Sequence, residues 1–276
     1  MSNNIGVDVG GTKMYMLAEH DGQYIEKKVP TGPDSTREYI KEQLDTFVAT
    51  LPFKVEGIGM ALPGLVDKGK TMPLSNVLPK LNGVEATYFS DGTYPVKFMN
   101  DVNAATLAEA IHHKDKHTVA VVMVGTGMAA GVTVEGELLT GSQGFAGEVG
   151  WAHVPYKGGM ERFHNLVAGA PILEIAGCTA SQLHDRLQAN DESAVTIVEE
   201  AAYYFGICLG QIIQFYNPDI IVVGGSVTTY PNYMDIAKKT AKQATLPAMY
   251  DHCKIIEPQD KDRIVALWGL LNEDWS

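Results

Sequence analysis

A glycine-rich turn near the start of the chain carries an acid, a hydroxyl and an ammonium group. The run Asp8-Val9-Gly10-Gly11-Thr12-Lys13 lies between two apolar stretches, Ile5–Val7 and Met14–Ala18, which are predicted to be buried strands. A buried carboxylate is costly unless it is paired, and adjacent glycines leave backbone N–H groups free to face an anion. The turn is therefore predicted to hold phosphate and a metal ion, and a purely structural hairpin turn is the alternative.

This turn does not match the two commonest nucleotide motifs. It contains neither the G-x-x-x-x-G-K-[ST] pattern of a P-loop nor a G-x-G-x-x-G pattern that opens a helix. Asp21-Gly22, a typical hairpin turn, instead separates Met14–Glu19 from Gln23–Val29. We therefore expect a strand, the glycine turn, a second strand, a tight turn and a third strand.

The same succession recurs in the second half of the chain. An apolar stretch, Val119–Val124, is followed by the turn Gly125-Thr126-Gly127, a second stretch, Ala129–Val134, and the tight turn Glu135-Gly136. This recurrence predicts two related halves, each with a glycine turn at the end of its first strand. We expect the two turns to face each other across a cleft.

Two further acids lie where a carboxylate can act on a hydroxyl group. Asp101 follows the predicted strand Val96–Met99, where it is either a proton acceptor or only the N-cap of the next helix. Glu148 lies in the glycine-rich segment Gly144–Gly150, where it either recognises hydroxyl groups or is an ordinary solvated residue. Both acids are candidate site residues.

A glycine pair follows an apolar stretch near the C-terminal side. Gly224-Gly225 comes after the predicted strand Ile220–Val223 and before a helix. Such a turn permits close approach by a flat ring or a ribose, and tight packing alone is the alternative.

Strands alternate with helices along the whole chain. This alternation, together with the hairpins, predicts an α/β fold with mixed sheets. A charged patch at Lys114–His117 places a domain boundary just before the second apolar repeat. Helices are predicted at Ser35–Ala49, Val102–His113, Pro171–Ile175, Ser181–Ala189, Ser193–Tyr216, Tyr233–Ala244 and Arg263–Asn272.

Composition narrows the class of protein. The 276 residues are 45% hydrophobic, which is enough for two moderate domains, and a net charge of -12 argues against a broad nucleic-acid surface. Three scattered cysteines form no disulfide framework and no C-x-x-C metal site. With neither a leader-like start nor a membrane-length apolar stretch, we expect a cytoplasmic protein.

Six segments occur in order: DVGGTK at 8–13, ALPGLVD at 61–67, N-D-x-N-A-A at 100–105, VGTGMAAG at 124–131, GFAGEVG at 144–150 and NPDIIVVGGSV at 217–227. Together they resemble the ROK family of sugar kinases and related repressors, within the actin-like ATPase superfamily. The resemblance covers nearly the whole chain and implies two ribonuclease-H-like domains with mixed sheets around an interdomain cleft. It also implies a homodimer that transfers the γ-phosphoryl group of ATP, with Mg²⁺, to a hydroxyl of a sugar.

The resemblance implies a role for each candidate residue. Asp101 is then the general base, and Asn100 and Glu148 hold sugar hydroxyls together with the backbone near Gly64. Asp8 lies near the Mg²⁺ ion, which it contacts through water. The nucleotide is held by the first turn with Asp8, Gly10, Gly11, Thr12 and Lys13, by the second turn with Gly125, Thr126 and Gly127, and by Gly224 and Gly225 beside the adenosine. The lobes implied are 1–117, completed by the C-terminal helix 263–276, and 118–262.

The sequence departs from the family pattern in the sugar pocket. Trp151 replaces the histidine that usually follows the G-E-[IV]-G segment, and His164 replaces a glutamate that contacts sugar. Both are candidate substrate contacts, although Trp151 can also simply fill the core. The cysteine run of the family's zinc module is absent, so no zinc is expected and Tyr156–Glu161 is predicted to be an ordinary loop.

The segments leave the sugar open among glucose, fructose, mannose, allose and N-acetylhexosamines. A catalytically silent sugar-binding protein is one alternative. A sugar-responsive regulator without a DNA-binding domain is another, and both the seven residues before Asp8 and the acidic charge argue against contact with DNA. An enzyme like acetate kinase or a hydantoinase is disfavoured by the N-D-x-N and G-E-V-G segments.

Overall fold

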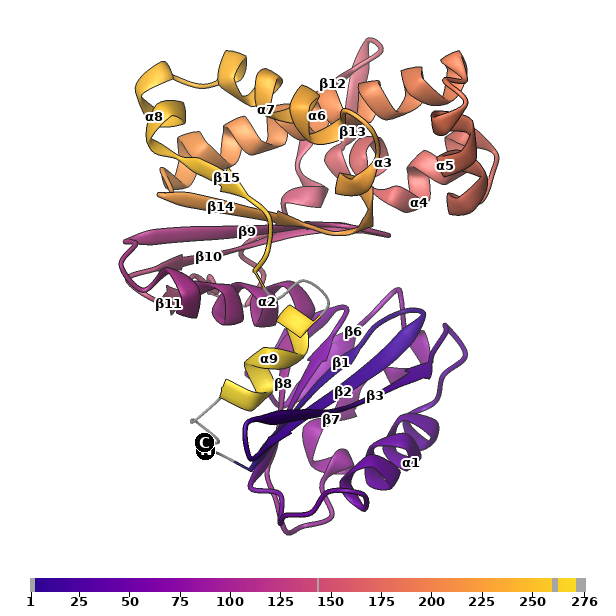
Figure 1. Cartoon of the computed structure of the whole chain (residues 1–276), viewed down its shortest axis with the longest axis vertical. Coiled ribbons are helices and arrows are strands. Elements are labelled where there is room, and N and C mark those ends of the chain that lie inside the picture. Colours follow the sequence, from indigo (N-terminus) through magenta and orange to yellow (C-terminus); the bar gives the residue numbers. More distant parts are fainter. Residues whose placement is uncertain (1–2, 143, 260–262, 272–276) are drawn as a thin grey trace. The chain divides into compact units, whose positions relative to one another are not determined.

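The computed structural model describes residues 3–142, 144–259 and 263–271, whose backbone forms two units (Figure 1). The N-terminal unit contains the described residues of 1–112, 140–146 and 259–271, and the C-terminal unit contains 113–139 and 147–258. The short segment 140–146 thus groups with the first unit rather than with the residues around it. The lobe limits at 117 and 262 stay a prediction.

Five strands form a mixed sheet in the N-terminal unit. In spatial order they are β3 (Gln23–Pro30), β2 (Lys13–His20), β1 (Asn4–Val9), β4 (Gly57–Leu62) and β8 (Val96–Asn100). β2 pairs antiparallel with β1 and β3, whereas β1, β4 and β8 run parallel to one another. The three-stranded succession predicted around the first glycine turn is therefore confirmed.

Helices cover both faces of this sheet because its central strands are buried on both sides. The helices are α1 (Arg37–Val48), α2 (Asp101–Ala110) and α9 (Ile264–Leu271). Val7 belongs to one cluster with Leu44 of α1, while Ala61 packs on the opposite face with Ala104 of α2 and Trp268 of α9. All three helices were predicted, and the predicted end of the last one at Asn272 lies outside the described residues.

A small antiparallel sheet follows β4 and was not predicted. It consists of β5 (Leu65–Asp67), β6 (Thr71–Leu74) and β7 (Val84–Glu85). Strands of two to four residues are too short to show a period in the sequence, and here their pairing depends on contacts between segments.

The sheet of the C-terminal unit repeats the first arrangement. Its order is β11 (Glu137–Leu138), β10 (Met128–Val134), β9 (Thr118–Val124), β14 (Ile220–Gly224) and β15 (Lys254–Ile256). β10 pairs antiparallel with β9 and β11, and β14 runs parallel to both β9 and β15. Two related halves, predicted from the recurring turns, are thus present in the strand order.

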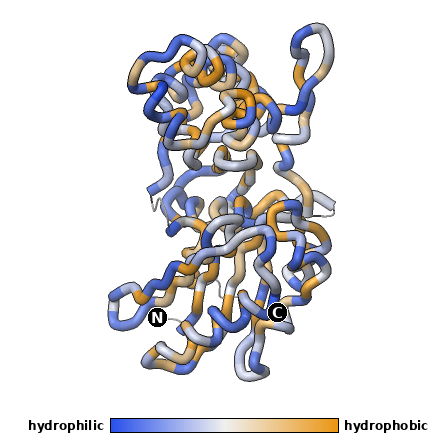
Figure 2. Tube along the Cα trace, turned by 90° about the vertical axis from the view of Figure 1, so that its right-hand side faces the viewer, coloured by the Kyte–Doolittle hydropathy of each residue, from blue (hydrophilic) through white to orange (hydrophobic). Residues whose placement is uncertain are grey.

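Helices pack on the second sheet and bury its apolar residues. They are α3 (Phe163–Val167), α4 (Gly169–Ala176), α5 (Ala180–Gln188), α6 (Glu192–Tyr216), α7 (Tyr233–Ala244) and α8 (Pro247–His252). The longer ones match their predicted ranges within a few residues, and the short α3 and α8 were missed. Figure 2 shows apolar residues gathered along the strands and helices of each unit.

The predicted loop at Tyr156–Glu161 is wrong, because this segment belongs to a hairpin. β12 (His153–Tyr156) pairs antiparallel with β13 (Gly159–Arg162). Lys157 and Gly158 connect the strands with φ angles of 46° and 83°. Two consecutive positive φ angles are typical of a type I′ hairpin turn, so the Lys-Gly pair was a signal that the sequence analysis overlooked.

The described residues contain neither a membrane-spanning helix nor a disulfide bond. None of the helices that the structure describes is both long and apolar enough to cross a bilayer. Cys178, Cys208 and Cys253, which all lie in described segments, are free thiols.

Glycines allow α9 to lie directly on the backbone of the first sheet, which gives a test of this packing. A Cβ atom at Gly6 of β1 would overlap the carbonyl oxygen of Ala266 in α9. We expect Gly6→Ala to lower the free energy of unfolding by at least ~1–3 kcal/mol, the usual cost of overpacking, as measured by urea denaturation. Gly32→Ala is the matched control, because a Cβ there meets no atom within 4 Å. Equal stability of the two variants would contradict the packing.

Candidate active site

The carboxyl ends of three parallel strands bring the N-terminal candidates to one edge of the sheet. Asp8 on β1 is paired in register with Ala61 on β4, and Leu62 at the end of β4 is paired with Asn100 at the end of β8. The segments that leave these strands therefore start side by side. They are the first glycine turn, the Pro63-Gly64 turn and the start of α2.

Asp8 and Asp101 are close enough to influence each other's charge. Burial raises the pKa of Asp8 to about 7, the negative charge of Asp101 raises it further, and the positive charge of Lys13 opposes both effects. A partly buried carboxylate beside a second one is an unfavourable arrangement without a cation. The pair is therefore chemically suited to a hydrated divalent cation near Asp8.

Asn100, and not Asp101, is the N-cap of α2. The Asn100 side-chain oxygen accepts hydrogen bonds from the amides of Val102 and Asn103, at 3.0 and 3.1 Å. Its side-chain nitrogen donates to the carbonyl oxygen of Gly64 at 3.1 Å. The alternative in which Asp101 serves only as a cap is wrong, because Asn100 already performs that role.

Asp101 occupies the first helical position and is partly buried. Its Oδ1 atom accepts a hydrogen bond from the amide of Val102 at 2.9 Å. The N-terminus of a helix favours the ionised form of a carboxylate, which is the form that accepts a proton. The bonds of Asn100 to the helix and to Gly64 fix the backbone from which Asp101 projects.

The first glycine turn presents amides that have no partner in the described part of the chain. The amide of Gly10 donates to the carbonyl oxygen of Lys13 at 2.9 Å, which closes the turn. The amides of Gly11 and Thr12 donate to no described residue. Free amides in consecutive positions are the groups that bind phosphate oxygens, so the geometry suits the predicted anion site.

The second turn has the same property in the C-terminal unit. The amide of Gly125 donates to the carbonyl oxygen of Gly127 at 2.9 Å. The amides of Thr126 and Gly127 find no acceptor among the residues that the structure describes. Both turns predicted to hold phosphate thus combine one closing hydrogen bond with two unpaired donors.

The Gly224-Gly225 turn lies beside the second glycine turn. Gly224 at the end of β14 is paired with Met123 of β9, and a Cβ at Gly125 would lie 3.9 Å from the Ser226 hydroxyl. Gly225 has a φ of 107°, and a Cβ there would overlap the backbone of Val124. Close packing therefore requires Gly225, while the role of the pair beside adenosine stays a prediction.

Glu148 starts a short 3-10 helix, Val149–Trp151, whose placement depends on glycine. The carbonyl oxygen of Gly147 accepts a hydrogen bond from the amide of Ala130 at 2.8 Å, and a Cβ at Gly147 would overlap the Ala130 carbonyl. This contact fixes the segment on β10. Burial raises the pKa of the partly buried Glu148 carboxyl.

The two residues that depart from the family pattern have different surroundings. The His164 ring lies beside the second glycine turn, because a Cβ at Gly127 would be 3.6 Å from its Cε1 atom. Burial first, and then the charge of Arg162, lowers the pKa of His164, so the imidazole is neutral at pH 7. The location of His164 beside the second glycine turn was not predicted from the sequence.

Trp151 does not fill the core. Its side chain is 58% exposed, and the Arg162 guanidinium carbon lies 4.6 Å from the ring centroid. Trp151 ends the short 3-10 helix that precedes β12. Its role as a sugar contact stays a prediction.

The described residues contain no group of three or more His, Cys, Asp or Glu side chains arranged to hold a metal ion. A magnesium ion held by one carboxylate and by substrate phosphates does not require such a group.

Sequence reasoning missed the residues that hold the two glycine turns from behind. Thr31, after β3, donates hydrogen bonds to the first turn, and the amides of Gly169 and Ala170 donate to the second. The Pro-Thr-Gly-Pro run at 30–33 signalled a rigid turn. Its contact with the glycine turn depends on the tertiary arrangement.

Comparison with known proteins assigns the chain to a family. The sequence profile of the ROK family matches residues 4–269. The chain belongs to the ROK family. An N-acetyl-D-glucosamine kinase of Vibrio vulnificus is 28% identical over 273 residues, which are 86% of this chain and 88% of that one. An N-acetylmannosamine kinase of Pasteurella multocida is 25% identical and covers 96% of this chain and 95% of its own length.

Solved structures of ROK family proteins share the fold. A glucokinase of Streptomyces griseus, in complex with glucose and AMPPNP, has a TM-score of 0.79 at 21% identity and covers 96% of this chain and 97% of its own. A hexokinase of Thermus thermophilus has a TM-score of 0.79 at 24% identity and covers 96% of each chain. The α/β fold with mixed sheets is therefore the actin-like ATPase fold, as predicted.

The raised pKa of Asp8 predicts how the stability of this ROK family protein depends on pH. The folded protein keeps the Asp8 proton up to about pH 7, whereas an unperturbed Asp releases it near 3.8. The stabilising effect of the proton is thus complete below about pH 4 and is lost as the pH rises through about 7. In EDTA, we expect wild type to lose more stability between pH 5 and pH 8 than Asp8→Asn, as measured by urea denaturation. Identical pH dependence in the two proteins would contradict the burial of this carboxyl group.

Proposed function

We propose that this protein is a kinase that transfers the γ-phosphoryl group of Mg-ATP to a hydroxyl group of a hexose or an N-acetylhexosamine. The observation that carries the proposal lies in the N-terminal unit. There, the carboxylate of Asp101 and the two free amides of the first glycine turn belong to segments that start at the same edge of the sheet. Amides that can bind an anion thus lie near a proton acceptor, and this positioning is the main requirement of phosphoryl transfer to an alcohol.

The first glycine turn holds phosphate oxygens in this proposal, through the amides of Gly11 and Thr12. Lys13, which is exposed, adds positive charge beside them. The second turn, with Thr126 and Gly127, supplies a second set of amides, and Gly224-Gly225 borders the adenosine. The AMPPNP bound to the Streptomyces griseus glucokinase supports ATP as the donor.

Asp8 is the residue of this chain that suits Mg²⁺. Its carboxyl group is partly buried and lies near Asp101, so that a divalent cation would favour its ionised form. The ion supplies neutralisation of phosphate charge when it is bound. Asp8 contacts it through water, as Mg²⁺ retains several water ligands.

Asp101 acts as the general base towards the sugar hydroxyl. A helix N-terminus favours a negatively charged side chain, and Asn100 holds the backbone in place. The second Asn100 amide hydrogen and the backbone near Gly64 bind neighbouring hydroxyl groups. A base in this position contributes typically ~10²–10⁴-fold to the rate.

Sugar selection is assigned to Glu148, Trp151 and His164. The two named relatives act on N-acetylhexosamines and are more similar in sequence than the glucokinase of known structure. We therefore favour an N-acetylhexosamine over glucose as the acceptor. A homodimer, a cytoplasmic location and lobes at 1–117 with 263–276 and at 118–262 are further parts of the proposal.

A coupled ADP-release assay with a panel of sugars tests this function. We expect Mg-ATP turnover with N-acetylglucosamine, N-acetylmannosamine or another hexose, and a kcat ~10²–10⁴-fold lower in Asp101→Asn with AMPPNP affinity retained. Asp45→Asn is the control, because this acid forms an ion pair with Lys41 on the surface of α1, away from the proposed site. Sugar binding without any ADP release would favour the silent binder instead, and normal turnover in Asp101→Asn would exclude this residue as the base.

A further inference from the structure

We propose that Thr31 is a positioning residue for the first glycine turn: its hydroxyl group orients the Gly10-Gly11 peptide so that the Gly11 amide faces the nucleotide phosphates. This inference rests on the proposed kinase function and extends it to a residue outside the glycine motif. Thr31 lies just after β3, eighteen residues beyond the Lys13 that ends the motif.

Thr31 contacts the glycine turn at two points. Its hydroxyl group donates a hydrogen bond to the carbonyl oxygen of Gly10 at 2.6 Å, and its amide donates to the carbonyl oxygen of Thr12 at 3.0 Å. The hydrogen bond from the Thr31 amide continues the antiparallel pairing of β2 with β3 by one residue. The hydrogen bond from the Thr31 hydroxyl group is not part of this strand pairing, because its acceptor, Gly10, precedes β2 on the other side of the turn.

The hydroxyl bond determines where the next amide points. In a trans peptide, the carbonyl and N–H groups point in opposite directions, and no cis peptide occurs in the described chain. Because the Gly10 carbonyl points at Thr31, the Gly11 N–H points away from it. This amide is one of the two that have no acceptor among the described residues of the chain.

The C-terminal unit performs the same task with different groups. The carbonyl oxygen of Gly125 accepts a hydrogen bond from the amide of Gly169 at 2.7 Å, and that of Thr126 accepts one from Ala170 at 3.3 Å. Both donors are at the N-terminus of α4. Each turn thus has two carbonyl groups that accept hydrogen bonds from a neighbouring segment, and two amides without an acceptor in the described chain. In the first turn both donors belong to Thr31, whereas in the second they belong to the start of α4.

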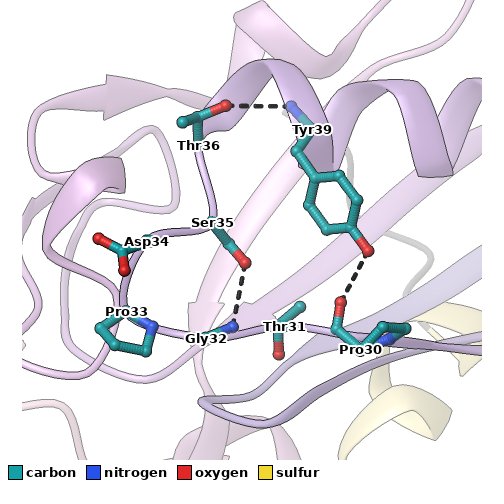
Figure 3. A pocket seen from close by; sticks show the side chains of 8 residues that line it. All are labelled: Pro30, Thr31, Gly32, Pro33, Asp34, Ser35, Thr36 and Tyr39. Carbon is teal, nitrogen blue, oxygen red and sulfur yellow. Dashed lines mark hydrogen bonds between the residues drawn. The ribbon is translucent and has the colours of Figure 1, made fainter.

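Hydrogen bonds tie the segment that carries Thr31 to the start of α1 (Figure 3). The Tyr39 hydroxyl donates to the carbonyl oxygen of Pro30 at 2.7 Å, and the amide of Gly32 donates to the Ser35 hydroxyl at 3.0 Å. Thr36 caps α1 by accepting from the amide of Tyr39 at 3.3 Å. These residues line a surface pocket of about 490 Å³. Thr31 therefore holds the turn from a fixed base.

Three variants separate positioning from stability. Thr31→Val keeps the shape and the backbone bond but removes the hydroxyl group, and Thr31→Ser keeps the hydroxyl group. Thr36→Val is the matched control, because it removes a threonine hydroxyl from the same segment at a point that contacts only α1. Thr31→Ala is a second test of the hydroxyl group should the valine variant fold poorly.

The readouts are the Kd of AMPPNP with Mg²⁺ by calorimetry, the KM values for ATP and for sugar, and the Tm. We expect Thr31→Val to weaken AMPPNP binding and raise the ATP KM by about 5- to 10-fold, the effect of one hydrogen bond, with the sugar KM unchanged. Thr31→Ser should restore both values. Thr36→Val should lower the Tm and leave the nucleotide constants unchanged.

The outcomes distinguish this inference from the proposed function. Wild-type AMPPNP affinity in both Thr31→Val and Thr31→Ala would overturn the inference alone. Parallel changes in the Tm, the sugar KM and the ATP KM would also overturn it, because they indicate a general structural role. Absence of AMPPNP binding by wild-type protein would refute the kinase function itself, and the inference with it.

Discussion

The proposed site depends on one constraint: a few backbone amides at the ends of strands must stay unpaired while carbonyl groups of the same turns are held by hydrogen bonds. Unpaired backbone donors are unfavourable wherever water is excluded, so a protein keeps them only where the surrounding structure holds them in place. In both units this is achieved from the carbonyl side. Thr31 binds the carbonyls of Gly10 and Thr12, and the start of α4 binds those of Gly125 and Thr126.

The parallel strands explain why the acids lie beside the first of these turns. Register pairs Asp8 with Ala61 and Leu62 with Asn100, so three strand ends share one edge. Asn100 uses its side-chain amide to cap α2 and to bind Gly64, which ties two of the three segments together. Asp8 and Asp101 come close through this arrangement, and the pKa of Asp8 is raised first by burial and then by the charge of Asp101.

Much of the fold could be read from local patterns. The hairpins at Asp21-Gly22 and Glu135-Gly136, the long helix α6 and the repeated glycine turns each have a period or a turn signal within a few residues. The short strands β5 to β7 were missed because they form only through pairing with one another. The β12–β13 hairpin was missed because its Lys-Gly turn was not read as a turn signal. The alternative in which Trp151 fills the core is wrong, because the Arg162 guanidinium lies over an exposed ring.

The amino-acid sequence by itself determined the two glycine turns, the acids Asp8 and Asp101 and the family, because these depend on residue type and short spacing. Only the tertiary structure decided which groups orient those residues. That Asn100 rather than Asp101 caps α2, that Thr31 binds Gly10, and that His164 lies beside Gly127 all depend on contacts between segments. Such contacts follow from strand register and helix packing, which bring residues together from positions that no local pattern connects.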